Sequence, residues 1–206
     1  MTGKGTGAVG STASVRLLVT LIDDRQPGYR QHAESVARLT RMVGLQLGLD
    51  ACALENLRMS AFLHDIGSLR LPFGHVGSRW KLAAEERRIW ETHPVTGACL
   101  VRILDLPSEV ECAILGHHER WDGSGYPNGL SRTQVPLPGR ILGVCDAYDE
   151  ALSGQLEMNA QRLSESEALD RLRSEARRRF DQNIVLALSD ALDQEREISA
   201  LTRVVG

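Results

Sequence analysis

The chain contains 206 residues with a formal net charge of -3, and it is long enough for one domain with its own hydrophobic core. Hydrophobic residues make up 42% of the chain and aromatic residues only 4%, a balance that suits packed helices better than an aromatic-rich β-sandwich. The charge gives no basis for binding a nucleic-acid polymer, because polyanion-binding proteins usually carry a basic face. We therefore expect an all-α protein, a single-domain helical bundle.

The start of the chain and its cysteines indicate a cytoplasmic protein without a membrane partner. No apolar run reaches the roughly 20 residues that cross a bilayer. Residues 1–14 lack the continuous apolar core of a signal peptide, so we expect a flexible Gly/Ser/Thr tail before a helical domain over residues 15–206. The cysteines form no C-x-x-C pair, which favours buried thiols over a zinc knuckle or a disulfide framework; they are Cys52, Cys99, Cys112 and Cys145.

Apolar residues recur at near-helical spacing in successive segments of the chain. In chain order, helices are predicted over residues 15–22, 29–47, 54–63, 82–94, 95–104, 107–118, 140–152, 166–178 and 183–196. Glycine and proline are expected to separate these helices. Gly28 is the last residue of the break between the first and second helices, Gly67 ends the third helix, and Pro94 ends the fourth. Residues 73–81 and 119–138 are predicted to be loops.

Side chains able to bind metal gather at the predicted helix ends. Five of the six histidines lie in or beside motif-like segments, and two aspartates complete a set of seven nitrogen and oxygen donors from five helices; they are His32, His64, Asp65, His93, His117, His118 and Asp146. A helical bundle can direct such side chains towards one point. A single histidine on an apolar helix is more often a core residue, but the whole set favours a metal site.

The donor types indicate which metals would bind. Mixed imidazole and carboxylate ligands favour iron or manganese, with zinc or nickel as alternatives, and a bridging carboxylate can hold two ions about 3.5–4 Å apart. Other polar residues are expected to have structural or solvated roles. Glu119 and Asp122 are predicted to order the loop that follows the histidine pair or to bond to ligand histidines, rather than to bind metal directly. Asp149, Glu150 and the arginines over residues 171–179 are predicted to face solvent.

The motif sequence resembles a known family. His-Asp-Ile-Gly over residues 64–67, then His-His-Glu-Arg-Trp-Asp-Gly-Ser-Gly-Tyr-Pro over residues 117–127, and finally Asp146 resemble the signature of the HD-GYP domains. These domains are a bacterial branch of the HD metal-dependent phosphohydrolases, and the resemblance covers about residues 23 to 192. It implies an all-helical fold, the seven metal ligands given above with Asp65 as their bridge, and hydrolysis of cyclic di-GMP to pGpG and often on to GMP.

The resemblance also implies roles for residues outside the ligand set. Gly123, Gly125 and Tyr126 correspond to the GYP loop, which lies near the substrate and is implicated in docking partners such as diguanylate cyclase (GGDEF) domains. Gly28 occupies the position of a glutamate that holds a third metal in some members, so two divalent ions are expected here.

Several positively charged residues of the family pattern are replaced in this chain. Ser68 occupies the catalytic position of a lysine that assists at the scissile phosphate, and a hydroxyl cannot supply that charge. Ser78 replaces a second lysine, and residues 155–158 replace an Arg-Pro-Tyr-Arg segment. Arg70 and Arg79 are the candidates to compensate.

Three functions therefore remain open from the sequence. The first is an active phosphodiesterase with rearranged contacts to cyclic di-GMP or a related phosphorylated nucleotide. The second is a degenerate module that keeps its metals and regulates or docks a signalling partner. The third is another HD-type nucleotide phosphohydrolase.

Overall fold

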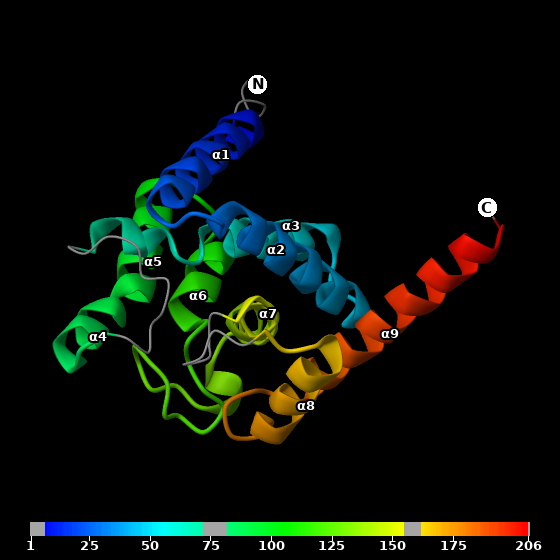
Figure 1. Ribbon diagram of the computed structural model, residues 1–206. Helices are drawn as coiled ribbons and strands as arrows, with labels where there is room; N and C mark the ends of the chain where they lie inside the picture. Colours follow the sequence, from blue (N-terminus) through cyan, green and yellow to red (C-terminus); the bar gives the residue numbers. More distant parts are fainter. Residues whose placement is uncertain (1–6, 72–81, 155–161, 206) are drawn as a thin grey trace.

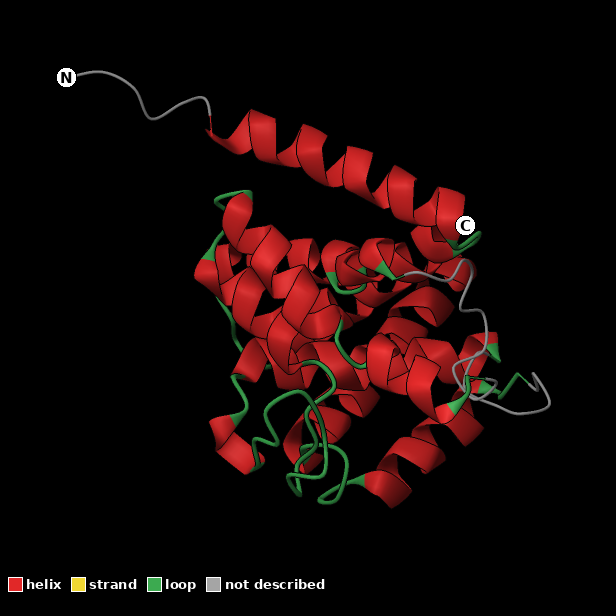
Figure 2. Cartoon of the chain, turned by 90° about the vertical axis from the view of Figure 1, so that its left-hand side faces the viewer, coloured by secondary structure: helices red, strands yellow, loops and turns green. Residues whose placement is uncertain are grey.

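The computed structural model describes residues 7–71, 82–154 and 162–205, and within these ranges it contains helices and loops but no strand (Figure 2). The α-helices are α1 (Gly7–Arg25), α2 (Tyr29–Gln46), α3 (Ala51–Leu63), α4 (Ala84–Trp90), α5 (His93–Ile103), α6 (Ser108–Gly116), α7 (Leu137–Ser153), α8 (Glu165–Glu175) and α9 (Gln182–Val205). The 3₁₀ helices of the same ranges are η1 (Ile66–Arg70) and η3 (Arg132–Gln134). The predicted all-α bundle is confirmed.

Local sequence signals explain where several helices begin and end. Gly28, with a φ of 94°, makes the left-handed turn that precedes α2. The Asp50 carboxylate accepts a hydrogen bond from the backbone N–H of Ala53 at 2.8 Å and caps α3. Gly154, with a φ of 78°, ends α7 in the left-handed conformation that glycine adopts without strain.

Helix α7 lies near the middle of the molecule and packs against helices on several sides. In Figure 1 it is seen almost end-on, with α2 and α3 on one side, α6 on another, and α8 and α9 beyond it. One hydrophobic cluster joins α7 to α2, α3, α8 and α9 through residues such as Leu39, Tyr148 and Leu188. A second cluster lies under α1 and includes Ile22, Leu63 and Ile114. Because α7 is surrounded, nearly every residue from Ile141 to Ala151 is buried.

The structure differs from the sequence prediction at several boundaries. Helix α1 begins at Gly7, inside the segment that was expected to be a tail, whereas residues 1–6 lie outside the described ranges. Pro94 lies in the first turn of α5 and does not end α4, because proline needs no N–H partner at a helix start. His93 therefore begins a helix and does not close one.

Two further expectations about individual residues are wrong. Gly67 does not end α3, which stops at Leu63, but lies inside η1. Of the cysteines, Cys145 alone is buried; Cys52, Cys99 and Cys112 are exposed. No described helix is both long enough and apolar enough to cross a membrane.

Candidate metal centre

The seven predicted donors come together from separate elements. His32 lies on α2, His64 and Asp65 follow α3, His93 begins α5, His117 and His118 follow α6, and Asp146 lies on α7. Their side-chain donor atoms form two groups, and within each group the atoms lie within 4.8 Å of one another. The groups are Asp65, His93, His117 and His118, and His32, His64 and Asp146. His118 is half-buried and the other six residues are buried.

Distances in the first group match ligands of a single ion. Asp65 Oδ1 lies 3.2 Å from His93 Nε2 and 4.0 Å from His117 Nε2, and the two imidazole nitrogens are 3.3 Å apart. Donor atoms that bind one ion at about 2.1 Å lie about 3 to 4 Å from each other. The spacing therefore fits a metal ion among these side chains.

The second group has the same spacing and is linked to the first through Asp65. Asp146 Oδ1 lies 3.2 Å from His32 Nε2 and 3.6 Å from His64 Nε2. The other oxygen of Asp65, Oδ2, lies 3.6 Å from His64 Nε2. Since its two oxygens face different groups, Asp65 has the geometry of a bridging carboxylate.

Hydrogen bonds to the backbone fix the tautomer of three histidines. His64, His93 and His117 each place Nδ1 against the carbonyl oxygen three residues earlier, at 2.9, 2.8 and 2.6 Å respectively. A carbonyl can only accept, so Nδ1 carries the hydrogen and Nε2 keeps its lone pair. Each Nε2 points into the donor cluster, which is the arrangement that metal-binding histidines require.

His32 has a different partner, because its Nδ1 lies 2.7 Å from Asp149 Oδ2. The prediction that Asp149 and Glu150 face solvent is wrong, since only 9% and 2% of these residues are exposed. Both lie on α7, whose central position leaves it no solvated face over this stretch. The sequence alone could not show that these two acids are buried, because acids within an amphipathic helix usually face solvent.

The two groups differ in their electrostatics when no metal is bound. Burial lowers the pKa of His32, but the hydrogen bonds that its ring donates to Asp146 and Asp149 outweigh that effect and raise the pKa to about 10. Burial and the neighbouring His93 and His64 lower the pKa of His117 to about 3. His117 is therefore neutral at physiological pH and ready to act as a ligand, whereas His32 must lose a proton.

Two glycines allow the supporting elements to approach closely. A Cβ atom on Gly67 would lie 2.0 Å from the carbonyl oxygen of His93, and one on Gly143 would lie 2.4 Å from the carbonyl oxygen of His117. Gly67 thus brings η1, and with it Asp65, against the start of α5. Gly143 brings α7 against the end of α6.

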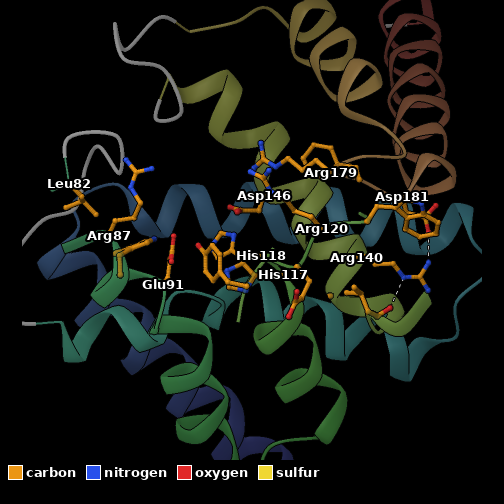
Figure 3. A pocket seen from close by; sticks show the side chains of 18 residues that line it. Leu82, Arg87, Glu91, His117, His118, Arg120, Arg140, Asp146, Arg179 and Asp181 are labelled. Atoms are coloured by element: carbon orange, nitrogen blue, oxygen red, sulfur yellow. Dashed lines mark hydrogen bonds and ion pairs between the residues drawn. The ribbon is translucent and has the colours of Figure 1, made fainter. Parts of the chain in front are cut away.

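A pocket of about 400 Å³ opens beside the donor cluster. His117, His118 and Asp146 lie on its wall, and Figure 3 shows Arg87 and Glu91 to one side of the histidines and Arg120, Arg140 and Arg179 to the other. These four arginines were not predicted as site residues. Arg120 is inside the recognised motif, but nothing in the sequence distinguishes the other three from surface arginines.

The arginines of the pocket differ in how their charge is balanced. Arg140 forms an ion pair with Asp181, and Arg179 Nη1 lies 3.2 Å from Glu175. Arg87 and Arg120 are exposed and form no ion pair within the part of the chain that the structure describes. Arg87 and Arg120 are therefore accessible to an anion, in a pocket whose lining also carries the acids Glu91, Glu119, Asp146 and Asp181.

The predicted substrate-binding residues are only partly brought to this pocket. Tyr126 lines it and its ring centroid lies 4.8 Å from that of His118, whereas Gly123, Gly125 and the exposed Arg70 are not among the lining residues. Ser68 is buried, and its hydroxyl accepts a hydrogen bond from Gln26 Nε2 at 3.1 Å. Arg79, Ser78 and residues 155–158 lie outside the described residues.

The loop after the histidine pair is held by its own acids, as the sequence predicted. The Glu119 carboxylate accepts from the backbone N–H groups of Asn128 at 2.7 Å and Leu130 at 3.0 Å. Asp122 Oδ1 accepts from the backbone N–H of Ser124 at 2.9 Å. Gly125 packs so closely that a Cβ atom would lie 2.4 Å from the backbone nitrogen of Arg120. These contacts keep Tyr126 beside His118.

The turn between α8 and α9 supports the same loop. The backbone N–H groups of Trp121 and Asp122 donate to the carbonyl oxygens of Arg179 and Arg178 at 3.0 and 2.9 Å. The prediction that the arginines over residues 171–179 lie on a solvated helix face is therefore wrong for Arg177 and Arg178, which lie beyond the end of α8, and for Arg179. Arg179 lies in this turn because α8 ends at Glu175, and its side chain reaches the pocket.

Comparison with known proteins places this arrangement in a family. The family model described as HD domain matches residues 16–184. The chain belongs to the HD domain family. This result confirms the resemblance seen in the sequence, and the buried histidine and aspartate cluster of this HD domain is suited to binding metal ions.

Individual relatives of this HD domain are proteins named for cyclic dinucleotides. It is 31% identical to a cyclic di-GMP phosphodiesterase from Thermotoga maritima, covering 74% of this chain and 42% of that protein. It is 32% identical to the cyclic di-GMP phosphodiesterase response regulator RpfG from Xanthomonas campestris, covering 83% and 45%. The chain therefore spans less than half of the length of these relatives.

A solved structure shares the fold. The cyclic GMP-AMP specific phosphodiesterase V-cGAP3 from V. cholerae superposes with a TM-score of 0.69 at 21% identity, covering 91% of this chain and 50% of that one.

Proposed function

We propose that this HD domain is a metal-dependent phosphodiesterase that hydrolyses cyclic di-GMP to pGpG, GMP or both. The observation that carries the proposal is the pocket in which arginines flank the buried histidine and aspartate cluster. A site for metal ions beside exposed arginines suits a phosphodiester, because bound metal ions and guanidinium groups both neutralise negative charge on the phosphoryl oxygens. Relatives named cyclic di-GMP phosphodiesterases support the choice of substrate. We also propose a cytoplasmic location.

We further propose two divalent ions, with iron or manganese favoured by the mixed ligands. His32, His64 and Asp146 would hold one ion, His93, His117 and His118 would hold the other, and Asp65 would bridge them. When bound, such ions lower the pKa of a water molecule and draw charge from the phosphoryl group. The chain itself contributes histidines in a fixed tautomer, and the close backbone contacts at Gly67 and Gly143 that hold the ligand-bearing elements together.

The arginines offer a replacement for the cation that Ser68 cannot supply. Ser68 is buried against Gln26, so its hydroxyl has a structural partner. Arg87 and Arg120 stand on opposite sides of the histidines in Figure 3 and are exposed to an incoming ligand. In this proposal they contact phosphate oxygens of a substrate whose reacting phosphate lies at the metals.

The absence of a cation at Ser68 also favours a second function, with weakened or no catalysis. In that alternative the domain keeps its metals and regulates or docks a partner such as a diguanylate cyclase (GGDEF) domain through the loop that includes Gly123, Gly125 and Tyr126. A related HD activity on another phosphorylated nucleotide would differ from both in its product.

The test is a hydrolysis assay on Mn²⁺-loaded protein with cyclic di-GMP, with products separated by chromatography. We expect pGpG or GMP from the unaltered chain. Arg120→Gln should raise KM about tenfold or more with little change in kcat, because a charge-assisted hydrogen bond to substrate is worth about 1.5–3 kcal/mol.

Arg41→Gln is the matched control, since Arg41 is exposed on α2 and does not line the pocket. Metal-loaded protein that leaves cyclic di-GMP intact would contradict the enzymatic proposal and favour the regulatory one. Hydrolysis of 3'3'-cGAMP in its place would still be phosphodiesterase activity, on a related cyclic dinucleotide, whereas dephosphorylation of another nucleotide would favour the third alternative.

A further inference from the structure

One imidazole is held by two carboxylates from the same helix. Asp146 Oδ1 lies 3.2 Å from His32 Nε2, and Asp149 Oδ2 lies 2.7 Å from His32 Nδ1. Residues three apart lie on one face of a helix, so α7 can reach both nitrogens of His32 from successive turns. All three residues are buried, with exposed fractions of 8% for His32, 2% for Asp146 and 9% for Asp149.

This arrangement differs from that of the other candidate ligands. His64, His93 and His117 each donate from Nδ1 to a neutral backbone carbonyl. A carbonyl fixes the tautomer, whereas a carboxylate also carries a negative charge that makes the opposite nitrogen a stronger electron donor. Among these four histidines, His32 is thus the one whose metal-facing nitrogen is supported by a charge.

We infer that Asp149 is a positioning residue for the metal centre. It holds the ring of His32 so that Nε2 faces the ion shared with His64 and Asp146, and its charge strengthens the bond from that nitrogen. Asp149 is not itself in either group of candidate ligands. The inference rests on the proposed metal centre, but it does not depend on which nucleotide is the substrate.

The test measures Mn²⁺ binding by calorimetry for the unaltered chain, Asp149→Ala and Asp149→Asn. Removal of such a carboxylate typically lowers metal affinity about 10- to 100-fold. We therefore expect Asp149→Ala to weaken one of two sites by that factor and to leave the other unchanged. Asp149→Asn should lose less, because its amide oxygen still accepts from Nδ1.

Electron paramagnetic resonance provides a readout that does not depend on catalysis. With two equivalents of Mn²⁺, the unaltered chain should show the signal of a coupled pair, and Asp149→Ala should show isolated ions. Asp190→Asn is the control, because Asp190 is exposed on α9, away from the candidate ligands. It should behave as the unaltered chain does.

Each outcome distinguishes this inference from the proposed metal centre. Two sites of unchanged affinity in Asp149→Ala would overturn the role of Asp149, whereas an unaltered chain that binds no Mn²⁺ would contradict the metal centre itself. If Asp149→Ala loses its helical circular dichroism, Asp149→Asn decides the question: weaker binding at one site supports the inference, and unchanged binding at both overturns it.

Discussion

His117 links the chemistry of the site to the stability of the metal-free protein. Its pKa is lowered to about 3 by burial and by the neighbouring His93 and His64. An unfolded chain would bind a proton at this residue near its ordinary pKa of 6.5. The unfolded state therefore binds more protons between these two values, so the free energy of unfolding falls as the pH drops through this window.

We predict a loss of about 2 kcal/mol from His117 between pH 7 and pH 5, since each pKa unit is worth about 1.36 kcal/mol. His32 offsets part of this loss, by about 0.8 kcal/mol: its raised pKa of about 10 keeps it protonated in the folded state throughout, whereas the unfolded chain takes up its proton near 6.5. Urea unfolding of metal-free protein should show a greater loss for the unaltered chain than for His117→Gln. Equal losses would show that His117 is not held neutral.

The sequence predicted the candidate ligands better than it predicted their surroundings. All seven predicted donors come together in the structure; they were predicted because most of them stand in short motif-like segments that resemble a known family signature. Asp149 was placed in solvent because a solvated acid and a buried one look alike in a helical pattern. Its role depends on His32, which is 117 residues away in the chain.

At the scale of elements, the donor cluster depends on how closely η1 can lie against α5. Asp65 ends the turn before η1 and His93 begins α5, and the approach of these elements is possible because Gly67 has no side chain. A Cβ atom there would meet backbone atoms, namely the His93 carbonyl oxygen at 2.0 Å and the Gly97 nitrogen at 2.8 Å. Backbone cannot move aside as a flexible side chain can.

Gly67→Ala should therefore separate Asp65 from His93 and cost about 1–3 kcal/mol of unfolding free energy. We also expect weaker Mn²⁺ binding, measured by calorimetry alongside urea unfolding. Gly116→Ala is a matched control next to His117, because its Cβ would find its nearest neighbour at an ordinary 3.5 Å. If the two variants bind metal equally well, the close approach at Gly67 does not set the site.

The boundaries that were predicted wrongly share a physical cause. Pro94 and Gly67 were interpreted as helix stops from local propensity, yet one begins α5 and the other allows two backbones to touch. Proline occurs both after a helix end and in the first turn of a helix, and glycine occurs both at helix ends and where two backbones touch. Only the neighbouring elements decide which of these positions each residue takes. Local sequence patterns therefore predicted the helices but not how α4 and α5 divide the segment around His93.

At the scale of the whole molecule, the composition and helical periodicity were sufficient to predict an all-α bundle. The central place of α7 was not predictable, because its burial arises from contacts with its chain neighbours α6 and α8 together with α2, α3 and α9, which lie further away in sequence. The same arrangement creates the pocket, whose lining comes from α4, the histidine pair that follows α6, the loop after it, α7 and the turn before α9. Arg87, Arg140 and Arg179 meet there only in the folded chain.

The account as a whole is tested most directly by measuring metal content and cyclic di-GMP hydrolysis on one anaerobically purified sample supplied with iron or manganese. We predict two ions per chain together with formation of pGpG or GMP, and we predict that His117→Ala loses bound metal and hydrolysis together. A chain that binds no metal under these conditions, or a His117→Ala variant that retains full metal content and turnover, would contradict the account.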